Sequence, residues 1–76
     1  MPTVHREHGL SFVIYVDDHL PPHVHVTGRG TARIALDPMV ALMESRGLSN
    51  ADIGRVLDVV RSQREMMLEA WIRIHG

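Results

Sequence analysis

The sequence has 76 residues, so we expect residues 1–76 to form one small domain. Nine acidic and eight basic residues give a formal net charge of −1, which excludes a strong overall attraction to nucleic acid or to an anionic membrane. The absence of cysteine excludes disulfides, thiolate nucleophiles and sulfur ligands to a metal. No apolar run approaches the roughly 18 residues of a transmembrane helix, so we expect a cytoplasmic protein without membrane contact.

The first part of the chain, residues 1–45, has the pattern of short β-strands. Residues 3–6 form a candidate first strand, followed by Gly9, which suits a turn. Residues 10–16 are rich in β-branched and aromatic side chains, and their alternation predicts a strand with one buried face. The side chains expected on that face are Leu10, Phe12, Ile14 and Val16.

Two further strands are predicted around a glycine-rich turn. Residues 23–27 alternate with period two, so the valines point one way and His23 and His25 point the other. Residues 28–30 contain two glycines and predict a hairpin turn. Residues 31–36 resume the alternation, which places Arg33 on the same face as the histidines. Residues 39–45 fit either an edge strand or a short helix.

The second part, residues 49–75, has the pattern of a helix. Ser49 is the expected N-cap, with Asp52 near the capping-box position. Apolar residues then recur at helical spacing up to residue 74, with Arg64 as the one interruption. The sequence therefore predicts an α+β fold, in which a small antiparallel sheet of three to five strands packs against one long C-terminal helix. A sheet this small also makes a homodimer plausible.

Three of the six histidines fall within seven residues, at His19, His23 and His25, and two prolines separate the first from the others. On one strand face, His23 and His25 have α-carbons roughly 6–7 Å apart, so both imidazoles can bind one metal ion. His19 is the third candidate ligand, and Asp17 or Asp18 is a weaker oxygen donor. This pattern suits a divalent transition metal such as zinc.

The same residues also suit chemistry without a metal. Histidine is a common general acid and base in enzymes, so His23 and His25 can serve in these roles on a phosphodiester, with His19 orienting them and Arg29 or Arg33 stabilising negative charge. A third interpretation is that the histidines are polar residues on a solvated strand face. His5, His8 and His75 lie near the termini, where we expect solvent exposure.

Four segments resemble a known family: residues 1–4, the block from His19 to Val26, residues 45–49, and residues 64–71, which end in Leu-Glu-Ala-Trp. Together they resemble the small bacterial domain of unknown function numbered 4160 over nearly the whole chain. The resemblance implies one half of a two-gene cassette, beside the domain of unknown function numbered 2442, similar to toxin-antitoxin loci. By that analogy the chain binds a small cognate protein, and any activity is directed at RNA or DNA.

Two functional hypotheses follow, and whether the chain is an enzyme stays open between them. In the first, it is a toxin-like ribonuclease that uses the histidine block. In the second, it is a non-catalytic interaction or regulatory module, antitoxin-like or an inhibitor, that docks a partner through its sheet edge or its helix. The near-neutral charge favours the second hypothesis, and the histidine cluster favours the first.

Overall fold

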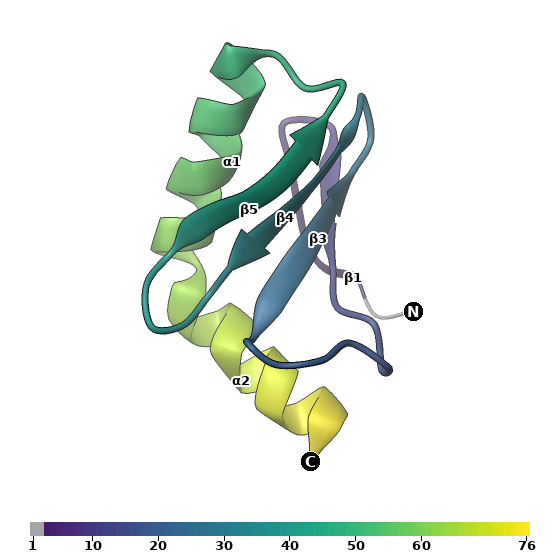
Figure 1. Cartoon of the computed structure of the whole chain (residues 1–76), viewed down its shortest axis with the longest axis vertical. Coiled ribbons are helices and arrows are strands. Elements are labelled where there is room, and N and C mark those ends of the chain that lie inside the picture. The colour runs from purple at the N-terminus through teal and green to yellow at the C-terminus, as the bar shows by residue number, and fades with distance from the viewer. Residues whose placement is uncertain (1–2) are drawn as a thin grey trace.

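The computed structural model describes residues 3–76, and residues 1–2 of the predicted strand-rich part lie outside the described residues. Five strands form one sheet, and two helices follow them (Figure 1). The strands are β1 (Thr3–Glu7), β2 (Leu10–Val13), β3 (His23–Thr27), β4 (Thr31–Ala35) and β5 (Ala41–Arg46). The helices are α1 (Asn50–Ser62) and α2 (Arg64–His75).

The sheet is a simple meander in which each strand pairs with its successor in antiparallel orientation, in the order β1-β2-β3-β4-β5. The predicted α+β fold and antiparallel sheet are therefore confirmed. Residues 39–45, for which strand and helix were both open, contribute to the edge strand β5. Strand β3 is the central strand of the sheet and is paired on both sides, with β2 and with β4. His23 and His25 therefore lie on a strand that is held by hydrogen bonds along both edges.

The core lies between one face of the sheet and the helices. Alternation in β3 buries Val24 and Val26 completely, and Ile34 of β4 joins them. From the helices, the core receives Val56, Val60, Met67, Ala70 and Trp71. The opposite face of β3 presents His23 and His25, as the alternation predicts.

Val16 was predicted in this core, and that prediction is wrong because its side chain is 71% exposed. Strand β2 ends at Val13, and a turn held by Tyr15 and Asp18 follows. The Asp18 amide donates to the Tyr15 carbonyl at 3.1 Å, and the Tyr15 amide donates to Asp18 Oδ2 at 3.0 Å. This turn takes Val16 out of the strand direction and into solvent.

The helical part is divided in two, so the prediction of a single long helix is wrong in this detail. The N-cap prediction is confirmed, since Ser49 Oγ accepts from the Asp52 amide at 3.1 Å. The division falls at Gln63, whose ψ of 13° departs from helical values. Arg64 then donates from Nε to the Leu36 carbonyl, at 2.6 Å, which ties the start of α2 to the residue that follows β4.

The change of direction lets α2 pass beside the loop that leads into β3, as Figure 1 shows. His75, near the end of α2, contacts the Tyr15 carbonyl of this loop through Nε2 at 3.1 Å. Among residues 3–76, no helix is long and apolar enough to cross a membrane. The loop, the start of β3 and the last turns of α2 therefore meet at one end of the sheet.

Candidate metal centre

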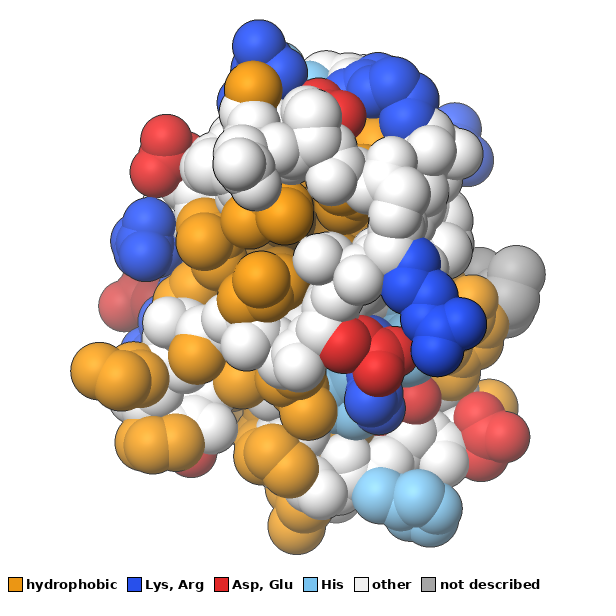
Figure 2. Space-filling model, turned by 45° about the horizontal axis from the view of Figure 1, so that its top comes forward, with side chains coloured by type: hydrophobic (Ala, Val, Ile, Leu, Met, Phe, Trp, Pro, Cys, Tyr) orange, Lys and Arg blue, Asp and Glu red, His pale blue; other side chains and the backbone are white. Residues whose placement is uncertain are grey.

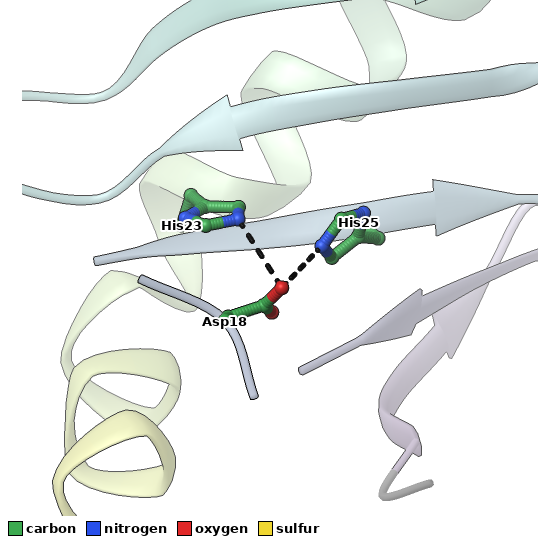
Figure 3. A group of neighbouring side chains, drawn as sticks. All are labelled: Asp18, His23 and His25. Carbon is green, nitrogen blue, oxygen red and sulfur yellow. Dashed lines mark hydrogen bonds and ion pairs between the residues drawn. The ribbon is translucent and has the colours of Figure 1, made fainter. Parts of the chain in front are cut away.

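Asp18, His23 and His25 converge at this end of the sheet (Figure 3). Asp18 Oδ1 lies 2.9 Å from His25 Nε2 and 3.6 Å from His23 Nε2. One ligand atom from each residue lies within 4.8 Å of the other two. The two histidines come from β3 and the carboxylate from the preceding loop, so a turn and a strand build the cluster together.

His23 is the most constrained of the three residues. It is only 5% exposed, and its Nδ1 lies 2.8 Å from the Pro21 carbonyl oxygen. A carbonyl can only accept, so Nδ1 donates, and the lone pair of the neutral ring sits on Nε2, which faces Asp18. The indole of Trp71 packs against this imidazole, with ring centroids 5.5 Å apart. His23 is thus fixed in position, orientation and tautomer.

His25 sits two residues further along β3 and is half-buried. Its Nε2 donates to Asp18 Oδ1, and the Tyr15 ring meets its imidazole in an edge-to-face contact at a centroid distance of 4.6 Å. In the sheet it lies opposite Val13 on one side and opposite Arg33 on the other. His25 is therefore the member of the cluster that borders the open face of the sheet.

The pKa of Asp18 is subject to opposing effects, and those that favour the ionised carboxylate prevail. Burial alone raises this pKa, but the hydrogen bond from His25 and that from the Tyr15 amide lower it. Either imidazole lowers it further when protonated, so the pKa of Asp18 lies below its ordinary value of 3.8. The group therefore presents an ionised oxygen donor between two imidazole nitrogens.

This donor set fits a divalent transition metal. Zinc binds imidazole nitrogen and carboxylate oxygen at about 2.0–2.2 Å, which separates tetrahedral ligand atoms by roughly 3.3 Å. The two distances from Asp18 Oδ1, 2.9 and 3.6 Å, lie on either side of that value. The bond from His23 Nδ1 to a backbone carbonyl is the outer contact that usually orients a metal-binding histidine.

The sequence model of the family described as "Domain of unknown function (DUF4160)" matches residues 9–72. The chain belongs to this family. The matched range contains Asp18, His23 and His25, so the whole candidate centre lies inside the DUF4160 domain. No curated protein and no solved structure matches the chain.

The DUF4160 domain brings together only part of the ligand set expected from the sequence. His23, His25 and Asp18 are in the cluster, whereas His19 and Asp17 are exposed and outside it. The reason is the Tyr15–Asp18 turn, which directs Asp18 toward β3. Asp18, expected as a weaker ligand, therefore takes the third place.

The two arginines suggested for charge stabilisation lie in different places. Arg33 is the cross-strand neighbour of His25. Arg29 donates from Nη2 to Asp52 Oδ1 at 2.9 Å and from Nη1 to the His8 carbonyl at 2.9 Å. Arg29 thus links the β3–β4 turn to the start of α1 and to the β1–β2 turn, and the structure does not bring it to the histidines.

His75, for which solvent exposure was expected, contributes to this end of the sheet in a way that the sequence pattern does not indicate. Its ring stacks on Trp71 at 3.9 Å between centroids, and its Nδ1 and Nε2 contact the carbonyls of Trp71 and Tyr15 at 2.9 and 3.1 Å. The expectation is therefore wrong for this residue. His75 belongs to the support of the centre, because it joins the helix that covers His23 to the loop that carries Asp18.

Proposed function

We propose that this DUF4160 domain binds one divalent transition metal ion, with zinc as the first candidate, through Asp18, His23 and His25. One observation carries the proposal. The His23 Nδ1–H···O=C bond to Pro21 turns the lone pair of Nε2 toward Asp18 Oδ1, 3.6 Å away, and neutral His23 then has no proton to share with that oxygen. Two lone pairs then face each other, and a cation bound between the two atoms would accept both of them.

The number of ligands supports a role beyond structure. Three protein ligands leave a coordination position for water or substrate, as in catalytic zinc sites, whereas structural zinc sites have four. A bound metal would supply Lewis acidity and a water of lowered pKa there. His25 is half-buried and lies at the open face of the sheet. A substrate would therefore reach that coordination position from the side of the cluster on which His25 lies.

Calorimetric titration with zinc tests the proposal on wild type and on the variants Asp18→Asn, His23→Ala and His25→Ala. We expect one zinc ion per chain in wild type and at least a hundredfold weaker binding in each variant. His19→Ala is the matched control, because it removes an exposed histidine of the same loop. Circular dichroism checks that each variant folds. Absence of zinc binding in wild type, or equal loss in His19→Ala, contradicts the proposal.

A second candidate is acid-base cleavage of RNA without a metal, and the 2.9 Å contact between Asp18 and His25 favours it. A carboxylate that accepts from Nε2 leaves Nδ1 of the same ring to take a proton from a substrate. Arg33, opposite His25 in the sheet, supplies positive charge for a phosphate. Cleavage of RNA that persists in a strong chelator and is lost in His25→Ala would favour this candidate over the metal centre.

The cassette role implied by the family resemblance is part of the same proposal. A cytoplasmic toxin-like component would arrest growth when expressed without its cognate partner, and the arrest would be lost in a His23→Ala/His25→Ala variant. A non-catalytic module would bind its partner equally well with or without those two changes. Growth and RNA integrity after induced expression, together with capture of the partner by both proteins, separate the two outcomes.

A further inference from the structure

A groove of about 390 Å³ opens on the sheet face that carries His25. We call it the Arg33 groove. Its walls include the side chains Tyr15, His25, Thr27, Thr31, Arg33 and Glu44. Figure 2 shows basic, acidic and histidine side chains gathered together on one side of the molecule, whereas hydrophobic side chains cover much of the rest of that view. The groove combines charged and polar side chains with apolar surface, and it shares His25 with the candidate metal centre.

Arg33 is only partly satisfied within the protein. Its Nη2 lies 3.1 Å from Glu44 Oε2. Its Nε is buried, and within residues 3–76 no acceptor lies within hydrogen-bonding distance. A buried N–H without an acceptor costs free energy. The Arg33 side chain as a whole is 40% exposed, so an acceptor from outside the described chain would reach it through the terminal nitrogens. A guanidinium that has one terminal nitrogen on Glu44 keeps further donors for such a group.

The register of the sheet sets Arg33 directly beside the candidate centre. His25 and Arg33 are a cross-strand pair, which places their α-carbons about 5 Å apart. The next pair on the same face is Thr27 and Thr31, roughly 6–7 Å further along the strands. Both threonines line the groove, and their hydroxyls donate or accept hydrogen bonds. A ligand lying along the groove would therefore meet His25 first, then the guanidinium, then two hydroxyls.

We propose that the Arg33 groove binds a small ligand through an oxyanion, either phosphate or carboxylate, which Arg33 holds. Guanidinium donors match both groups because two parallel N–H groups can reach two oxygens of one anion. The Tyr15 ring forms one wall, against which an aromatic or aliphatic part of the ligand can pack. Binding by Arg33 is independent of the metal, whereas the placement of the oxyanion next to a metal ion rests on the proposed function above.

The test is a nuclear magnetic resonance titration of the full chain, in metal-free and zinc-treated form, with two probes. Phenyl phosphate and benzoate each carry an aromatic ring and one of the two oxyanions. We expect at least one of them to bind in the millimolar range or tighter and to shift the amide signals of Thr27, Thr31 and Arg33. Arg33→Gln keeps a polar side chain but is shorter and removes the charge, so it should weaken binding about tenfold or more.

Arg61→Gln is the matched control, because Arg61 lies exposed on α1 and, among residues 3–76, has a single ion pair, with exposed Asp58 at 3.5 Å. It makes the same change of charge and should leave binding within twofold. Preference for phenyl phosphate identifies a phosphate ligand, and preference for benzoate identifies a carboxylate ligand. Binding of neither probe, equal binding by Arg33→Gln, or shifts away from the groove overturns the inference.

The two proposals can fail separately in this experiment. If zinc does not bind, the metal-free titration still tests Arg33, and only the metal proposal is lost. If zinc binds but neither probe depends on Arg33, the groove inference is lost and the metal proposal stands. If zinc increases the affinity of the preferred probe and His25→Ala abolishes that increase, the oxyanion lies beside the metal.

Discussion

The Trp71 indole lies against the His23 imidazole with ring centroids 5.5 Å apart, so the second helix forms one wall of the candidate centre. Trp71 is only 6% exposed, and it also stacks on His75. Because its side chain serves both the core and the centre, we expect Trp71→Ala to lower the free energy of unfolding by about 3–5 kcal/mol. Zinc affinity should fall as well, because the His23 ring loses its neighbour.

Urea denaturation measures the loss of stability in Trp71→Ala, and calorimetric titration measures its loss of zinc affinity. Ile72→Ala is the control from the adjacent position, where the side chain is 64% exposed, and it should change stability by less than about 0.5 kcal/mol. Trp71→Phe keeps an aromatic ring and should retain most of the zinc affinity. Equal effects of the changes at positions 71 and 72 would mean that the helix does not support the centre.

Binding of zinc should also stabilise the fold, because the three ligands come from a loop and a strand that unfolding separates. At free zinc a hundredfold above the dissociation constant, the gain is about 2.7 kcal/mol. Thermal unfolding with and without a chelator measures it. The shift should persist in His19→Ala and vanish in His23→Ala, whereas a shift that survives in His23→Ala would place the metal elsewhere.

Two glycines should respond to alanine in opposite directions. A Cβ at Gly30 would meet the backbone of the β5–α1 connection, at the Arg46 carbonyl oxygen and, 2.7 Å away, at the Gly47 carbonyl carbon. Backbone cannot move aside cheaply, so Gly30→Ala should cost about 1–3 kcal/mol. A Cβ at Gly54, inside α1, meets nothing within 4 Å, so Gly54→Ala should stabilise by up to about 1 kcal/mol. Urea midpoints of both variants test this pair, and a stabilising Gly30→Ala would contradict the close approach.

Acid should weaken the fold through Asp52 at the start of α1. The hydrogen bonds from Arg29 lower the pKa of Asp52 below its ordinary value, although burial opposes them. A carboxyl with a lower pKa when folded binds fewer protons than in the unfolded chain. The contribution of Asp52 to the free energy of unfolding is therefore complete at pH values above the pKa that this carboxyl has in the unfolded chain. It is lost as the pH falls below about 4.

Urea midpoints at pH 6 and at pH 3 measure this dependence. Asp52→Asn should be less stable than wild type at pH 6 and should lose less of its stability on acidification. Asp18 contributes with the same sign, because its pKa is also lowered. If Asp52→Asn shows the same loss between the two pH values as wild type, the Arg29–Asp52 pair does not account for acid sensitivity.

Much of the fold could be predicted because its signals are local. Alternation in residues 23–27 separates the valines from the histidines, and Ser49 has the residue type and position of an N-cap. The division at Gln63 could not be predicted, since it coincides with a contact of Arg64 to Leu36, 28 positions earlier in the chain. The exposure of Val16 likewise follows from the Tyr15–Asp18 turn. The alternation of apolar side chains in residues 10–16 does not indicate where that turn begins.

The candidate site was predicted less completely than the fold. His23 and His25 share a strand, so their common face follows from the sequence. The choice of Asp18 over His19 as third member depends on the path of a loop, and residue type alone favoured the histidine. His75 contacts the Tyr15 carbonyl 60 residues away, and nothing in the sequence near either residue indicates that contact.

The most direct test of the metal centre is X-ray absorption at the zinc edge of the zinc-loaded protein, which counts the imidazoles bound to the metal. We expect two imidazole ligands and additional oxygen ligands, with metal–ligand distances of about 2.0–2.2 Å. The same measurement on His19→Ala should give an unchanged spectrum. A spectrum with no imidazole, or one in which His19→Ala removes an imidazole, would contradict a centre made of Asp18, His23 and His25.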